Sequence, residues 1–221
     1  MLNAVIFDFD GIIVDSEPMH HRAFNAILEP LGMGFSWEDY CSVYIGYDDR
    51  DVFREAFKAH GEKTCARDIK KMIADKAKVF QQLVNDGEAK PLPGAIELIE
   101  SIPGRLPIAL CSGALREDID PIIGNLGIAN AFSVIVTAED TKKSKPDPSP
   151  YRLTCEKLGL KDPSTAIAIE DTPLGIVSAK GAGLKVLAVT NSYDREYLLE
   201  ADAVTDSLEN TTRSSLEDMV L

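Results

Sequence analysis

The stretch Ala4-Val5-Ile6-Phe7-Asp8-Phe9-Asp10-Gly11 joins a short apolar run to two acidic residues and a glycine. Its β-branched and aromatic residues favour a buried strand. The acidic residues and the glycine at its end predict a loop directly after that strand. This order, an apolar strand that ends in carboxylates, is the pattern from which the rest of the chain can be interpreted.

From Ser16 onward the apolar residues recur at helical instead of strand spacing. Further helical patterns follow over residues 37–44, 50–59 and 64–84. No strand-like alternation interrupts this block, so we predict that residues 15–88 form an all-helical cap domain inserted after the first strand. We expect Phe53, Phe57 and Phe80, which recur at helical spacing, to form its small core.

After Pro91-Leu92-Pro93-Gly94, strand and helix patterns alternate to the C-terminus. The predicted strands are residues 107–111, 133–137, 165–169 and 185–190, and the predicted helices are residues 95–101, 116–126, 150–158 and 174–182. Repeated units of this kind with non-alternating apolar strands are typical of a parallel sheet covered by helices on both faces. We therefore predict a doubly wound, Rossmann-like α/β core over residues 1–14 and 89–221.

The composition excludes several classes of protein. The 221 residues carry 23 Lys and Arg against 36 Asp and Glu, a net charge of −13, without a basic run, so we expect neither nucleic acid nor a membrane as partner. No apolar stretch approaches the roughly 20 residues of a membrane span, and the N-terminus does not resemble a signal peptide. We expect a cytoplasmic protein, by default a monomer.

The four cysteines, Cys41, Cys65, Cys111 and Cys155, lie far apart in the chain. Their spacing fits neither a disulfide framework nor a zinc site. We expect all four to be reduced residues that serve in packing.

Polar residues follow the predicted strands at their carboxyl ends. They are Asp8, Asp10, Ser112, Gly113, Lys145, Glu170 and Asp171. In an open parallel sheet these ends lie along one edge, where ligands bind, so we expect these residues to converge on one site. Clustered carboxylates repel one another unless a cation is present, and an all-oxygen ligand set suits Mg²⁺. A metal beside a Lys and a Ser-Gly turn would bind phosphate and fits phosphoryl transfer.

These residues resemble the motifs of the haloacid dehalogenase-like phosphatases. The stretch from Asp8 to Glu17 resembles the first motif, Ser112-Gly113 the second, Lys145-Pro146 the third and Glu170-Asp171 the fourth. The helical insertion stands where the β-phosphoglucomutase-like and phosphoglycolate phosphatase-like branch has its cap. The resemblance spans the whole chain.

The resemblance implies a role for each matching residue. Asp8 would attack phosphorus and become an aspartyl phosphate, and Asp10 would be the general acid and base. The Asp8 carboxylate, the Asp10 backbone carbonyl and Asp171 would bind Mg²⁺, with Glu170 as a further ligand or a partner of one. Ser112 and nearby backbone amides, among them those of Gly11 and Gly113, would hold the phosphate, and Lys145 would neutralise it.

In the cap, His20, Gly46, Arg50 and Lys76 match substrate-contacting positions of the family. Lys76 also lies in a Lys-rich helix, where a solvated face is the simpler expectation. A β-phosphoglucomutase has cations around the position of Gly46, whereas here acidic residues surround Arg50. We therefore expect a phosphatase acting on a small phosphorylated metabolite, with the phosphomutase as the alternative.

Other interpretations of the same residues remain. Acidic residues after strands commonly cap the next helix, and Asp15, Ser16 or Asp171 could do only that. A phosphoacceptor signalling module also combines carboxylates, Mg²⁺ and a Lys, but it is shorter and has its phosphoacceptor on a middle strand. A binding protein without turnover would typically have lost Asp8 or Asp10.

Overall fold

The structure is a computed structural model that describes residues 1–45, 47, 49–102, 104 and 106–220. The chain divides into two compact units. One consists of residues 1–15 and 90–221, and the other of residues 16–89. We call the first the α/β unit and the second the helical unit.

The α/β unit contains a six-stranded sheet in the order β5-β4-β1-β6-β7-β8, in which all neighbours are parallel. The strands are β1 (Ala4–Phe7), β4 (Ile108–Cys111), β5 (Phe132–Val136), β6 (Ala166–Glu170), β7 (Lys185–Val189) and β8 (Ala203–Thr205). Strand β1 is central and buried along its whole length, as its uninterrupted apolar sequence predicts. The predicted fold class is therefore confirmed.

The register of the sheet determines which residues meet at its carboxyl edge. Phe7 pairs with Leu110 of β4 on one side and with Ile169 of β6 on the other. Because side chains advance in step along parallel strands, the residues that follow these three stand level with one another. Asp8, Cys111 and Glu170 are those residues, so strand pairing alone brings two of the predicted acids to one edge.

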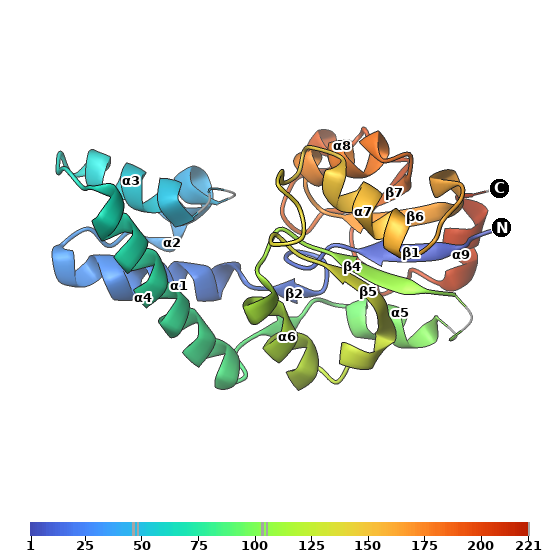
Figure 1. Cartoon of the computed structure of the whole chain (residues 1–221), viewed down its shortest axis with the longest axis horizontal. Coiled ribbons are helices and arrows are strands. Elements are labelled where there is room, and N and C mark those ends of the chain that lie inside the picture. The colour runs from blue at the N-terminus through green and yellow to red at the C-terminus, as the bar shows by residue number, and fades with distance from the viewer. Residues whose placement is uncertain (46, 48, 103, 105, 221) are drawn as a thin grey trace. The chain divides into compact units, whose positions relative to one another are not determined.

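Helices cover both faces of this sheet. Figure 1 shows α7 (Ser149–Lys157) and α8 (Pro173–Gly181) on one face and α5 (Ala95–Ser101) and α6 (Arg116–Asn125) on the other. Ile176 and Ala179 of α8 pack with Ala168 and Val186 of the sheet in one buried cluster. Each of these helices begins and ends within one residue of the predicted bounds.

The sequence patterns missed three short features of the α/β unit. Strands β2 (Val14–Asp15) and β3 (Lys90–Pro91) form an antiparallel pair beside the two boundaries of the helical unit. Strand β8 is half-buried, and helix α9 (Arg213–Asp218) is a single short segment. Elements of this length contain too few residues for a repeat of the hydrophobic period to be recognised, which is why periodicity does not detect them.

The helical unit contains α1 (Glu17–Leu28), α2 (Trp37–Asp39), a π-helical segment (Tyr40–Tyr44), α3 (Asp49–Ala59) and α4 (Ala66–Asn85). Its core is apolar and rich in aromatic rings. Phe53 of α3 is fully buried and meets Phe24 of α1 edge to face, with ring centroids 5.4 Å apart. Phe57 packs against this cluster, and Phe80 is also buried, as predicted.

Lys76 of α4 contradicts the prediction of a solvated lysine, because its residue is only 4% exposed. Its ammonium forms an ion pair with Asp49 at 2.9 Å and lies over the ring of Phe24 at 4.6 Å. A buried ammonium needs a compensating charge, and Asp49 from another helix supplies it. The Lys-rich composition of α4 concealed this residue, because the other lysines of the helix, Lys70, Lys71 and Lys78, are exposed.

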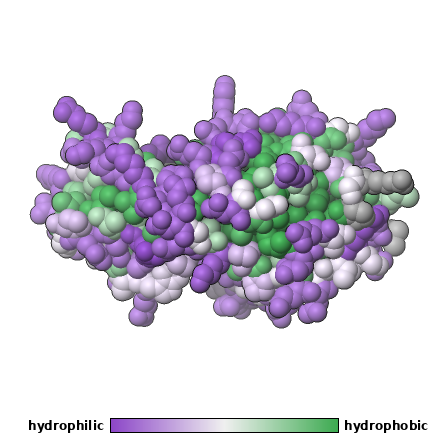
Figure 2. Space-filling view, turned by 90° about the horizontal axis from the view of Figure 1, so that it is seen from below, coloured by the Kyte–Doolittle hydropathy of each residue, from purple (hydrophilic) through white to green (hydrophobic). Residues whose placement is uncertain are grey.

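Figure 2 shows hydrophilic residues over most of the face in view, with hydrophobic residues gathered on this side of the α/β unit. Among the described residues, no helix is long and apolar enough to cross a membrane.

The four cysteines are free, as predicted. Cys111 and Cys155 are buried, and Cys41 packs against the core of the helical unit. Cys65 is exposed, and its thiol contacts Asp68 at 3.0 Å, so the expectation that every cysteine serves in packing is wrong for this one.

Replacing Asp49 by Asn should destabilise the helical unit by about 1–3 kcal/mol, because it leaves the Lys76 ammonium buried without its partner charge. The loss is smaller than for a fully enclosed pair because the Asp49 side chain is 32% exposed. Asp51→Asn is the matched control, since Asp51 lies on the same helix and pairs with Arg54 in solvent. It should cost no more than about 0.5 kcal/mol. Urea unfolding followed by circular dichroism measures both, and equal losses would contradict the analysis.

Candidate active site

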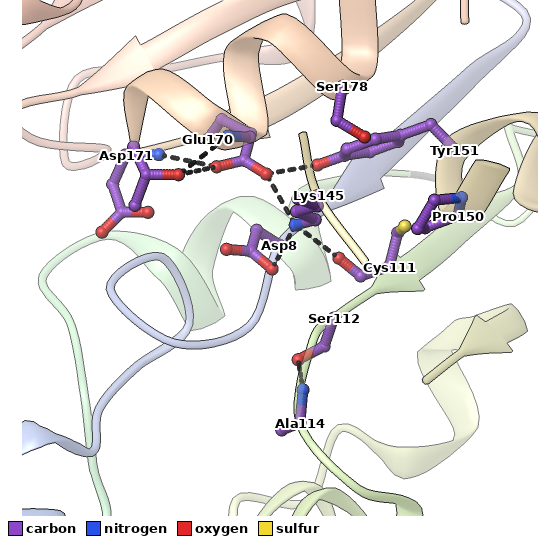
Figure 3. Close-up of polar contacts among 12 residues, drawn as sticks. Asp8, Cys111, Ser112, Ala114, Lys145, Pro150, Tyr151, Glu170, Asp171 and Ser178 are labelled. Carbon is purple, nitrogen blue, oxygen red and sulfur yellow. Dashed lines mark hydrogen bonds and ion pairs between the residues drawn. The ribbon is translucent and has the colours of Figure 1, made fainter. Parts of the chain in front are cut away.

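The centre of the candidate site is the ammonium group of Lys145, which lies between two carboxylates from different strands (Figure 3). Its Nζ donates to Asp8 Oδ1 at 2.8 Å and to Glu170 Oε1 at 2.6 Å. A third bond goes to the backbone carbonyl of Cys111 at 3.0 Å. The three donors of the ammonium therefore join the ends of β1, β4 and β6.

Asp171 completes an acidic cluster with Asp8 and Glu170, in which one carboxylate oxygen from each residue lies within 4.8 Å of the others. All three side chains are buried. Asp171 Oδ2 accepts a hydrogen bond from Ser192, whereas its Oδ1 is buried without a hydrogen-bond partner in the described part of the chain. Three buried carboxylates with such an orphaned oxygen are a donor set that fits a hard divalent cation.

The pKa values of the cluster reflect its charge and burial. Burial raises the pKa of Asp8 to about 7, although the Lys145 ammonium opposes that shift. Burial and the charges of Asp8 and Glu170 raise the pKa of Asp171 well above its usual range. Burial alone would lower the pKa of Lys145, but the two carboxylates that it contacts raise it instead. Lys145 is therefore charged at neutral pH, and the carboxylates favour any added positive charge.

Asp10 and Gly11 lie in the tight turn that follows β1. The amide of Gly11 donates to the carbonyl of Val14 at 2.8 Å, and Gly11 has a positive φ of 76° that favours glycine. The charge of Asp10 acts on the Asp8 carboxyl and raises its pKa, which is a minor effect beside burial. The turn thus keeps the two aspartates of the first motif close to each other.

Ser112 follows β4 directly and is buried, whereas Gly113 is exposed. The Ser112 hydroxyl accepts the backbone N–H of Ala114 at 2.9 Å (Figure 3). The Ser112 backbone N–H donates to Val136 in the neighbouring strand. The hydroxyl hydrogen of Ser112 can still donate to an anion, while its own amide is already used by the sheet.

The predicted residues of the cap lie in the helical unit. His20 Nδ1 is 2.9 Å from the Lys76 ammonium, and the His20 ring stacks on Phe80. Burial and the Lys76 charge lower the pKa of His20 well below its usual value. Arg50 is exposed on α3, and Gly46 lies outside the described residues. The structure thus brings together two of these four candidates, His20 and Lys76.

Three residues of the site, Tyr151, Asn191 and Ser192, escaped the sequence analysis. The Tyr151 hydroxyl, from α7, donates to Glu170 Oε1 at 2.7 Å, and the Lys145 ammonium lies 4.9 Å from the centre of the Tyr151 ring. Asn191 and Ser192 follow β7 and contact Gly11 and Asp171. Asn191 and Ser192 lie beyond the carboxyl end of a parallel strand, so the rule that located the other candidate residues could also have located these two.

Helix capping does not explain Asp171. The N-cap residue of α8 is Thr172, whose hydroxyl accepts the N–H of Gly175 at 3.0 Å. A Cβ on Gly175 would lie 2.0 Å from the Glu170 carboxylate, so a glycine is needed where the helix passes this acid. Asp171 is therefore available to the carboxylate cluster.

Comparison with known proteins identifies the family. Residues 5–189 match the family model of the haloacid dehalogenase-like hydrolases, which covers most of the chain. The chain belongs to this family. The family resemblance inferred from the four motifs is confirmed. The prediction that the chain is a hydrolase is also confirmed.

Several relatives of the chain are named phosphatases. The chain is 29% identical to validoxylamine A 7'-phosphate phosphatase from Streptomyces hygroscopicus subsp. limoneus over 94% of this chain and 95% of that protein. It is 30% identical to a phosphorylated carbohydrates phosphatase from Thermotoga maritima over 92% and 93% of the two chains. The crystal structure of CbbY from Rhodobacter sphaeroides in complex with phosphate has a TM-score of 0.86 and 25% identity, covering 98% of this chain and 100% of that one.

Replacing Asp171 by Asn should stabilise the protein in EDTA at pH 8. A carboxyl whose pKa is higher in the folded than in the unfolded chain opposes folding increasingly as the pH rises above 3.8. The amide of the variant carries no charge, so the variant should unfold at a higher temperature than the original chain at pH 8, and this difference should vanish towards pH 4. Thermal unfolding measures this difference.

The same melts with added Mg²⁺ give the second half of the test. Mg²⁺ should stabilise the original chain and have little effect on Asp171→Asn, because a ligand stabilises only the state that binds it. Asp120→Asn, at an exposed residue of α6, should respond to Mg²⁺ as the original chain does. A destabilised Asp171→Asn variant in EDTA at pH 8 would refute the electrostatic account.

Proposed function

We propose that the chain is a Mg²⁺-dependent phosphatase that hydrolyses a small phosphomonoester through an aspartyl phosphate on Asp8. The observation that carries this proposal is the buried contact of Asp8 with Lys145, beside Glu170 and Asp171. A carboxylate held next to an ammonium and an acidic cluster has the surroundings that an attack on a phosphate group needs.

The residues that would hold Mg²⁺ are Asp8 and Asp171 through their carboxylates and Asp10 through its backbone carbonyl. Support comes from the oxygen-only donor set and from the unpartnered, buried Asp171 Oδ1. Glu170 already accepts hydrogen bonds from Lys145 and Tyr151, so we assign it chiefly to holding Lys145. When bound, the metal supplies positive charge that offsets the repulsion between Asp8 and the phosphate oxygens.

Each residue of the site has its own role in the proposed reaction. Asp8 attacks phosphorus, and Asp10 protonates the leaving oxygen. Asp10 next removes a proton from the water that hydrolyses the aspartyl phosphate. Lys145 balances the charge on the transferred group, and the Ser112 hydroxyl donates to one of its oxygens. The helical unit is the cap that would exclude water and select the substrate.

We propose a phosphorylated sugar or a small acid of the phosphoglycolate kind as the substrate class. The Thermotoga maritima relative is named for phosphorylated carbohydrates, and the Streptomyces relative is named for validoxylamine A 7'-phosphate. The phosphomutase alternative requires a cation for a second phosphate, whereas Lys76 is already paired with Asp49. The acidic neighbours of Arg50 add to this preference for a monophosphate.

Hydrolysis of p-nitrophenyl phosphate should require Mg²⁺ and stop in EDTA. Asp8→Asn should abolish turnover, because the amide is not a nucleophile towards phosphorus. Asp120→Asn, at an exposed residue of α6, is the matched control and should keep the original rate. Full activity of Asp8→Asn would exclude the aspartyl phosphate.

Two substrates with different leaving groups test whether Asp10 acts as a general acid. Asp10→Asn should lower kcat on a sugar phosphate by about 10²–10⁴-fold, because a poor leaving group needs the acid. The rate of the first step with p-nitrophenyl phosphate should fall much less, since p-nitrophenolate leaves without protonation. Burst-phase kinetics and intact mass spectrometry of the phosphorylated protein measure that step. Equal losses with both substrates would contradict general acid catalysis by Asp10.

β-Glucose 1-phosphate with a trace of its bisphosphate separates the phosphatase from the phosphomutase. We expect inorganic phosphate to accumulate and glucose 6-phosphate to remain absent, because Asp49 neutralises Lys76. Coupled assays for the two products measure this ratio. Accumulation of glucose 6-phosphate without phosphate release would favour the phosphomutase.

A further inference from the structure

The loop that follows β7 touches two other segments of the candidate active site. Ser192 Oγ donates a hydrogen bond to Asp171 Oδ2, and Asn191 Nδ2 donates to the backbone carbonyl of Gly11 at 2.7 Å. Both residues are exposed, so neither serves to fill the core. Their polar groups nevertheless point to a proposed metal ligand and to the turn that carries Asp10.

The contact with Ser192 makes the two oxygens of Asp171 unequal. Oδ2 accepts the serine hydroxyl, while Oδ1 is buried without a partner in the described part of the chain. A hydrogen bond to one oxygen restricts rotation of the carboxylate about its χ2 torsion and leaves the other oxygen for a cation. Partners of this kind set the orientation and the affinity of metal-binding carboxylates.

Gly11 shows how closely the three segments approach one another. A Cβ at this position would lie 1.8 Å from Asp171 Oδ2 and 2.9 Å from Ser192 Oγ. The turn after β1 therefore has no room for a side chain beside the Asp171 carboxylate. Ser192 and Gly11 enclose the same oxygen, Oδ2, so both favour a single orientation of Asp171.

We propose that Asn191 and Ser192 form a positioning clamp for the metal-binding edge. Ser192 holds Asp171 with Oδ1 available to Mg²⁺, and Asn191 ties the same loop to the carbonyl of Gly11. The clamp acts through Asp171 and the Asp10–Gly11 turn and does not itself touch the reacting phosphate. This inference rests on the proposed Mg²⁺-dependent function.

Calorimetric titration of the full chain with MgCl₂, without substrate, tests the clamp. Ser192→Ala should weaken Mg²⁺ binding by about 10–100-fold, as loss of a ligand's hydrogen-bond partner typically does. Ser192→Thr keeps the hydroxyl and should bind Mg²⁺ within a few-fold of the original chain. Ser164→Ala is the matched control, because Ser164 is also exposed and donates to a loop carboxylate, Asp162, at 2.7 Å. It should bind Mg²⁺ unchanged.

A double-mutant analysis tests whether Asn191 and Ser192 act together. Asn191→Ala should also weaken Mg²⁺ binding, and the double variant with Ser192→Ala should bind more tightly than the product of the two single effects predicts. Residues that act through one loop are not additive, whereas independent sites are. Independent, multiplicative effects would contradict a single clamp.

The outcomes separate this inference from the proposed function. If the original chain binds no Mg²⁺, the metal-dependent function itself fails. If it binds Mg²⁺ and Ser192→Ala binds equally well or more tightly, the clamp is wrong and the function stands. Thermal unfolding in EDTA should stay cooperative in Ser192→Ala, with only a small loss of stability from the hydrogen bond that the buried Asp171 carboxylate no longer receives, so a general loss of folding would contradict a positioning role.

Discussion

The placement of one ammonium between two buried carboxylates is the constraint on which the site depends. Lys145 can be buried only because Asp8 and Glu170 balance its charge, and those acids come from two adjacent strands. A shift in the register of β1 against β6 would remove one partner and leave a buried charge uncompensated. The ion pairs therefore couple the correct strand alignment to the correct geometry of the chemistry.

The charges of this cluster do not cancel. Asp8, Glu170 and Asp171 face a single ammonium within the cluster. Burial raises the pKa values of Asp8 and Asp171, and the neighbouring carboxylates add to that rise. The helical unit contains the opposite case, because Asp49 pairs with Lys76 one to one. The α/β unit thus retains attraction for a cation, while the buried lysine of the helical unit has little charge left for a second anion.

The sequence was sufficient for the fold and for the acidic cluster, because both follow from rules that act over short stretches. Apolar runs located β1, β4 and β6, and the carboxyl edge of a parallel sheet then brought Asp8, Lys145 and Glu170 together. It was not sufficient for Lys76, because composition indicates the average environment of a helix and not that of one side chain. Tyr151 was missed for a related reason, because a hydroxyl on a helix becomes significant only once its partner carboxylate is located. Ser192 was missed although it follows a parallel strand, where the same rule could have located it. The roles assigned to individual residues stay predictions until the variants are measured.

The antiparallel pair β2 and β3 affects how the inserted helical unit can be exchanged in evolution. Val14 stands opposite Pro91 and Asp15 opposite Lys90, so the chain leaves the α/β unit and returns to it at neighbouring positions. Because the two ends of the insertion are joined in this way, its length and sequence impose little strain on the sheet. Recombination could exchange the inserted helices between genes while the edge with the proposed active site stays intact, so that the proposed functions of the two units could evolve separately.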